Sequence, residues 1–153
     1  KLCASIKGNT LLLFQLVEKH GVLLYNELKT LDRKVFFVYG GTTTDTREKI
    51  RAITELEKDA IIVASYGTFS TGINIRAINN IVFASPSKSR IRVLQSIGRG
   101  LRQSDNKDRV KLFDVSDNIS YKSRPNFTYR HFTQRLNIYK EEQFNYDINR
   151  INL

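Results

Sequence analysis

Five short apolar runs are the feature of this sequence that most restricts its fold. They are Thr10–Phe14, Val35–Tyr39, Ala60–Ala64, Asn80–Ala84 and Val110–Val115. Each run has the length of a strand and is apolar almost throughout, and strands of this kind are buried on both faces of a parallel sheet. The sequence therefore predicts an α/β fold in which helices flank a parallel sheet, with functional loops at the carboxyl ends of the strands.

Between these runs lie segments that are predicted to form helices. Gly21–Leu31 carries leucines at helical intervals, and Asp45–Glu48 resembles a capping box that begins a helix ending near Asp59. A further helix is marked by Ile91, Leu94 and Ile97. These segments are expected to cover the two faces of the sheet.

One long C-terminal helix is predicted after Pro125, over about Asn126 to Asn145. Its stripe consists of Tyr129, Phe132, Leu136, Tyr139 and Gln143. We expect this largely aromatic stripe to pack on the sheet. Stacking of nucleic-acid bases on Tyr129 or Phe132 is the alternative interpretation.

Charge is distributed unevenly over the 153 residues. The net charge is +10, and the segment from Lys88 to Arg135 holds 12 Lys or Arg against 4 Asp or Glu. Such a basic segment is typical of a surface that meets a phosphate backbone, although a solubilising surface is the simpler alternative.

Composition excludes several classes of protein. The single cysteine, Cys3, excludes an internal disulfide and a multi-cysteine zinc site, which fits a cytoplasmic location. The apolar runs are too short to cross a membrane. The chain contains no Met and begins at Lys1, so we expect it to be part of a longer protein.

The segment Gln95–Arg102 reads Q-x-x-G-R-x-x-R. Two arginines three positions apart present planar forks of donors, which suit a polyphosphate, and in nucleotide hydrolases such a finger neutralises charge on the transferred phosphoryl group. In the alternative interpretation, Arg99 and Arg102 only cap the carbonyl end of a helix.

Two further polar segments follow apolar runs. Ser65–Ile75 combines hydroxyl residues with a Gly-Ile-Asn-Ile sequence, and Gly40-Gly41 is followed by Arg47. Ordinary explanations exist for each, because glycine is common in turns and Ser65 or Thr68 could simply cap a helix. The order of the segments along the chain is more informative than any one of them.

Together these segments resemble superfamily 2 helicases. Thr10–Phe14 with Gln15 resembles motif IV, Ser65–Ile75 motif V and Gln95–Arg102 motif VI, over about residues 8 to 116. The resemblance implies a second RecA-like helicase domain over residues 1–120. It also implies a C-terminal helical extension over 121–153 that packs on this domain.

The resemblance also assigns roles to individual residues. Arg99 and Arg102 would reach the γ-phosphate of ATP. The nucleotide would further be contacted by Gln95, Gly72, Asn74 and Gly98. Nucleic acid would be contacted by Thr68, Gly67, Gly40, Gly41, Lys88 and Arg90.

Some parts of an ATPase are missing from the sequence. It contains no G-x-x-x-x-G-K-[ST] loop and no Asp-Glu pair at a strand end to hold Mg²⁺. We therefore expect an absent N-terminal RecA-like domain to bind most of the ATP and Mg²⁺, and this chain alone to be inactive. Asp114 is expected to form a salt bridge or cap, and His20 and His131 to have packing roles, with no metal site.

The function implied is an ATP-dependent DNA helicase. It would act on branched DNA, single strands and RNA–DNA hybrids in recombination, repair and replication restart. Two alternatives remain open: a non-catalytic nucleic-acid-binding module on a RecA-like scaffold, and a small-molecule-binding α/β domain.

Overall fold

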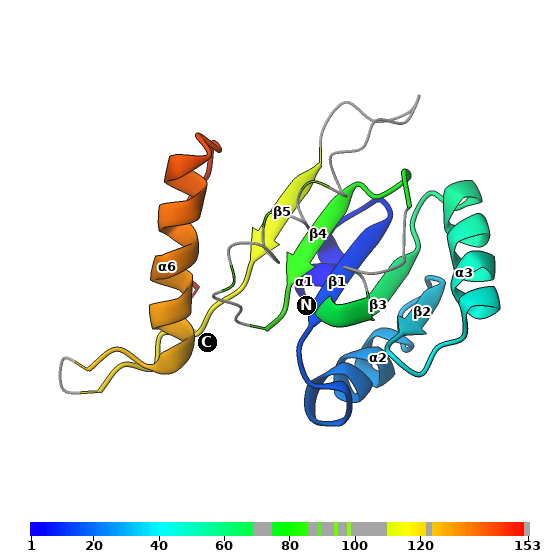
Figure 1. Ribbon diagram of the computed structural model, residues 1–153, viewed down its shortest axis with the longest axis horizontal. Coiled ribbons are helices and arrows are strands. Elements are labelled where there is room, and N and C mark those ends of the chain that lie inside the picture. The colour runs from blue at the N-terminus through cyan, green and yellow to red at the C-terminus, as the bar shows by residue number, and fades with distance from the viewer. Residues whose placement is uncertain are drawn as a thin grey trace.

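One parallel sheet organises the protein. The computed structural model describes residues 1–68, 75–85, 89, 94, 98, 110–121 and 124–151. Its strands are β1 (Thr10–Phe14), β2 (Val35–Val38), β3 (Ile61–Ser65), β4 (Asn80–Phe83) and β5 (Lys111–Asp114). They pair in the order β2-β3-β1-β4-β5, and all four pairings are parallel (Figure 1). The parallel α/β sheet expected from the five apolar runs is thus confirmed.

Helices cover both faces of this sheet. They are α1 (Leu2–Ser5), the π-helix η1 (Val17–Gly21), α2 (Val22–Leu28), α3 (Thr44–Leu56) and α6 (Phe127–Glu141). The first three pack on one face, in a cluster with Phe14 and Val63. Helices α3 and α6 pack on the other face, with Leu13 and Phe83. Successive residues of β1 therefore point into opposite clusters, as the strand period requires.

Gly21 brings η1 and α2 close to the central strand. A Cβ atom at this position would lie 2.5 Å from the ring of Phe14, which is fully buried. A larger residue would push the helical segment off β1, because a packed core cannot absorb an added methyl group without strain. The π-helix itself was not expected from the sequence.

Helix α3 begins two residues earlier than the capping box at Asp45–Glu48 suggested. The side chain of Thr43 accepts a hydrogen bond from the Thr46 backbone N–H, so Thr43 is the N-cap. Asp45 lies in the first turn, where its charge complements the helix dipole. The helix ends at Leu56, before the expected Asp59.

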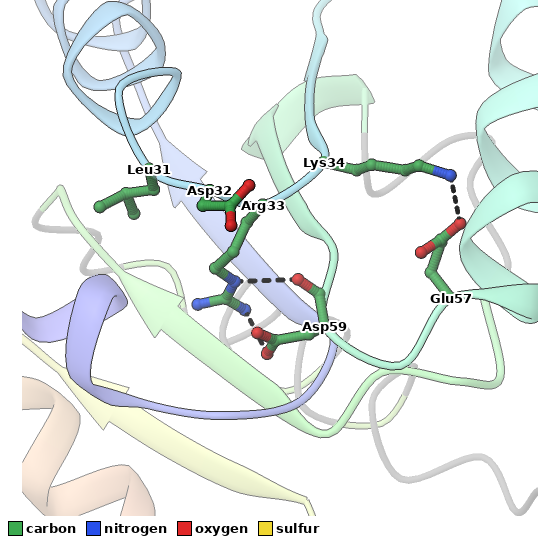
Figure 2. A pocket seen from close by; sticks show the side chains of 6 residues that line it. All are labelled: Leu31, Asp32, Arg33, Lys34, Glu57 and Asp59. Atoms are coloured by element: carbon green, nitrogen blue, oxygen red, sulfur yellow. Dashed lines mark hydrogen bonds and ion pairs between the residues drawn. The ribbon is translucent and has the colours of Figure 1, made fainter.

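The amino edge of the sheet is held together by Arg33. Its guanidinium donates to the carbonyl oxygens of Cys3, Ile6 and Gly8, and it forms an ion pair of 2.9 Å with Asp59 (Figure 2). The side chain is only 8% exposed. Arg33 therefore connects the segment before β1 to the segment before β3.

Helix α6 attaches to the last strand through a buried ion pair. Arg135 is fully buried and binds Asp114 in a bidentate manner, with Nη2–Oδ1 and Nε–Oδ2 distances of 2.6 and 2.7 Å. The hydroxyl of Tyr139 donates to Asp114 Oδ2 at 2.8 Å. Burial and the adjacent carboxylate of Asp114 raise the pKa of Tyr139, so the phenol remains protonated. The salt bridge expected for Asp114 is confirmed.

The buried face of α6 overlaps the predicted stripe in Tyr139, which is buried, and in Leu136, which packs against the same core cluster. Its most buried residues are His131, Arg135, Ile138 and Tyr139. The helix ends at Glu141, short of the predicted Asn145. Gln143 adopts a left-handed conformation with φ 57°, and Phe144 N–H donates to Tyr139 O. This is a Schellman ending, in which the left-handed residue stops the helix.

We predict that the buried ion pair is essential for stability. Arg135→Met leaves the Asp114 carboxylate without its bidentate partner in a site that is 9% exposed. Breaking a buried pair in this way costs about 3–5 kcal/mol. The loss should appear in the free energy of unfolding, measured by urea denaturation.

The exposed Arg130 on the same helix provides the matched control. Arg130→Met should change the unfolding free energy by less than about 1 kcal/mol, because it removes only a surface contact with Phe127. Equal losses in the two variants would contradict the role assigned to Arg135.

Candidate nucleic-acid interface at the carboxyl edge

The carboxyl edge of the sheet gathers the described parts of three segments that the sequence singled out, which begin at Gln15, Gly40 and Ser65. The register aligns the row Val38, Ala64, Leu13, Phe83 and Asp114 across the five strands. The chain leaves this row directly into Tyr39-Gly40-Gly41, Ser65–Thr68, Gln15 and Ser85. Segments far apart in the sequence therefore meet along one edge.

Ser65 and Thr68 form a turn at the end of β3. Their hydroxyl oxygens lie 2.8 Å apart, and Ser65 Oγ accepts a hydrogen bond from Thr68 N–H. Both side chains are buried, whereas Gly67 between them is exposed. Ser65 thus caps the residues that follow β3, and Thr68 contributes its hydroxyl to the turn.

Tyr66 connects the ends of two strands. Its hydroxyl donates to the Ser85 carbonyl at 3.1 Å, and its ring centroid lies 5.8 Å from that of Phe83. The residue is only 2% exposed and belongs to the same buried cluster as Tyr139 of α6. The turn after β3 is therefore fixed to the end of β4.

A histidine contacts the same edge. Ser85 Oγ accepts a hydrogen bond from Gln15 N–H and lies 2.6 Å from His20 Nδ1. Burial lowers the pKa of His20, which favours a neutral imidazole that shares a hydrogen bond with the Ser85 hydroxyl through Nδ1. This contact was missed because His20 has no partner nearby in the sequence.

The turn after β2 is closed by its own residues. Thr42 N–H donates to Tyr39 O, and Thr42 Oγ1 accepts from Tyr39 N–H. Arg47 Nη2, from the first turns of α3, donates to the carbonyls of Tyr39 and Gly40 at 3.4 and 3.3 Å. The two bonds from Arg47 orient the carbonyl groups of Tyr39 and Gly40 toward α3.

The four described glycines among the predicted site residues fall into two groups. A Cβ atom on Gly41 would lie 2.7 Å from the ring of Tyr39, so packing within the protein explains this glycine. Gly40, Gly67 and Gly98 have no described atom within 4 Å of such a Cβ. None of these four has the positive φ that favours glycine; among the described glycines only Gly8 does, at 95°.

Most of the predicted nucleotide-contacting residues lie outside the described part of the chain. These are Gly72, Asn74, Gln95, Arg99 and Arg102, together with the predicted nucleic-acid contacts Lys88 and Arg90. Of the predicted site residues, the described ones are Gly40, Gly41, Gly67, Thr68 and Gly98. The first four lie at the carboxyl edge, and Gly98 is exposed.

A pocket of about 420 Å³ lies at the opposite, amino edge. Its lining includes Arg33 with Asp59 and Lys34 with Glu57, two ion pairs (Figure 2). Because these charges neutralise each other, the pocket presents no net charge from them to an anionic ligand. The carboxyl edge is therefore the better candidate site.

Neither a metal site nor a membrane-spanning helix is found among the described residues. Among them, no group of three His, Cys, Asp or Glu side chains could hold a metal ion. None of the described helices combines the length and the apolar character that crossing a membrane requires.

Comparison with known proteins identifies the family. Residues 1–104 match the helicase conserved C-terminal domain. The ATP-dependent DNA helicase UvsW of Enterobacteria phage T4 is 35% identical over 155 residues, covering 95% of this chain and 31% of that protein. A putative ATP-dependent RNA helicase of Methanocaldococcus jannaschii is 31% identical over 84 residues, covering 54% of this chain and 11% of that protein.

Solved structures agree with these matches. The crystal structure of T4 UvsW superposes with a TM-score of 0.72 at 34% identity, over 92% of this chain and 30% of that one. The C-terminal domain of the DEAD-box protein Dbp5 superposes with a TM-score of 0.65 at 18% identity, over 91% of this chain and 72% of that one, which shows the fold alone. This chain therefore belongs to the helicase conserved C-terminal domain family and has its RecA-like parallel sheet.

Proposed function

We propose that this chain is the C-terminal motor domain of an ATP-dependent DNA helicase. The observation that carries the proposal is the 35% identity to a protein named as such a helicase, over 95% of this chain. Branched DNA, single strands and RNA–DNA hybrids are the proposed substrates, in recombination, repair and replication restart. The protein would act in the cytoplasm, which is that of the bacterial host if a phage encodes it.

Residues 1–120 would form the RecA-like motor domain and 121–153 its helical extension. The chain spans 31% of the length of UvsW, so the activity belongs to a longer protein. An N-terminal RecA-like domain would provide most of the contacts to ATP and Mg²⁺. ATP supplies the phosphoryl group that is transferred, and Mg²⁺ neutralises its charge. Arg99 and Arg102 would complete the site by pairing with the phosphate oxygens.

The carboxyl edge would contact the nucleic-acid backbone. Gly40 and Gly67 are glycines that neither backbone conformation nor neighbouring described atoms require. Glycine at such positions allows another backbone to approach closely. Thr68 and Gly41 in the same turns, with Lys88 and Arg90, would add contacts. Because these contacts are to phosphate, binding should be insensitive to base identity.

The arginine finger is tested by ATP hydrolysis. In the full-length protein, Arg102→Ala should lower DNA-stimulated ATP turnover by about 10³–10⁵-fold, equivalent to roughly 4–7 kcal/mol. DNA affinity should be retained, because the finger acts on the nucleotide. Arg150→Ala, at an exposed arginine outside both the motifs and the basic segment, is the control. Unchanged turnover in Arg102→Ala would favour a non-catalytic nucleic-acid-binding module instead.

The backbone contact is tested at Gly40. Gly40→Ala places a methyl group in open space, so the melting temperature should not change. We expect affinity for single-stranded DNA to fall roughly three- to tenfold, or about 0.7–1.4 kcal/mol, in a fluorescence anisotropy titration. Ser5→Thr adds a methyl group at the exposed amino edge and should leave affinity unchanged. If neither variant changes the affinity, Gly40 does not contact the nucleic acid.

A further inference from the structure

We propose that Tyr39 is a stacking platform for a base of single-stranded nucleic acid that passes the Gly40-Gly41 turn. The inference rests on the function proposed above and assigns a residue that would distinguish a single strand from a duplex. Phosphate contacts at Gly40 would hold a single strand or a duplex alike, whereas an exposed ring can stack only on a base that is not already paired and stacked.

Tyr39 stands where such a base would arrive. It follows β2 directly at the carboxyl edge and adjoins Gly40, whose Cβ position is open. It is 38% exposed, whereas β2 ends in the fully buried Val38. Neighbouring positions on the protein would thus meet neighbouring parts of one nucleotide, its phosphate at Gly40 and its base at Tyr39.

The ring belongs to a column of aromatic side chains. Phe14 and Phe37 stack with centroids 5.6 Å apart, and the ring of Tyr39 lies 5.4 Å from that of Phe37 with the two planes tilted by 34°. Phe14 is fully buried, whereas Tyr39 at the other end of the column reaches solvent. A nucleic-acid base would pack on the solvent-exposed end of this row of rings, and base–aromatic stacking tolerates every base because each has a π-face.

The protein also fixes the ring before any ligand arrives. Both the N–H and the C=O of Tyr39 are hydrogen-bonded to Thr42, and Arg47 donates to the same carbonyl. Gly41 packs against the ring so closely that an added Cβ would lie 2.7 Å from it. A pre-positioned side chain loses little conformational entropy on binding, which favours affinity.

The test compares Tyr39→Leu with Tyr39→Phe in the full-length protein. Affinity for an oligothymidine strand and for a blunt duplex is measured by fluorescence anisotropy at several salt concentrations. Tyr39→Leu should weaken binding of the single strand by roughly fivefold to a hundredfold. The slope of log affinity against log salt should not change, because no phosphate contact is lost. Tyr39→Phe keeps the ring and should stay within about twofold of the wild type.

Tyr146→Leu is the matched control. Tyr146 is 39% exposed but lies beyond α6, so its replacement should change neither affinity. Equal weakening of single strand and duplex by Tyr39→Leu would overturn the proposal, as would an equal effect of Tyr39→Phe. If the wild type does not bind single strands, the proposed function itself fails; if it does and Tyr39→Leu is silent, only the stacking role fails.

A second measurement uses only wild-type protein, so it remains informative if Tyr39→Leu does not fold. Wild-type protein is photo-crosslinked to a strand containing 5-iodouracil, and the modified peptide is identified by mass spectrometry. Crosslinking at Tyr39 supports the platform. Crosslinks found only elsewhere, with the strand bound, would overturn it.

Discussion

Burial of one sheet on both faces is the constraint on which this structure depends. β1 lies at the centre of the strand order, and its side chains enter the two clusters alternately. Parallel strands are joined by crossover connections, and these connections place helices on both faces of the sheet. The crossovers in turn bring every strand out at the same edge, so the candidate site follows from the burial of the core.

The two edges of the sheet are built differently. At the amino edge, Arg33 and Asn9 use their side chains to satisfy carbonyl groups of the connecting segments. At the carboxyl edge the bonds of Tyr66, Ser85 and Arg47 run between turns and shape them, while glycines leave surface open. One edge closes the domain, and the other leaves glycine backbone open.

Sequence patterns located the strands and the helicase family because both are local signals. The burial of Arg135 could not be predicted, since its partner Asp114 lies 21 positions earlier and on another element. An arginine on a helix is ordinarily expected to face solvent. The sequence analysis therefore left Arg135 out of the buried face of α6. The contact of His20 with Ser85, 65 positions apart, was missed for the same reason. The predicted fingers Arg99 and Arg102 stay predictions, because they lie outside the described residues.

The attachment of α6 has a consequence for exchanging parts between helicases. The family match ends at residue 104, yet the acidic partner that α6 requires is the last residue of β5. A chimera that joins this helix to another RecA-like domain would bury a lone guanidinium unless that domain offers a carboxylate at the same strand end. β5 and α6 are therefore one transferable unit, and the natural junction for grafting lies before Lys111 rather than at Tyr121.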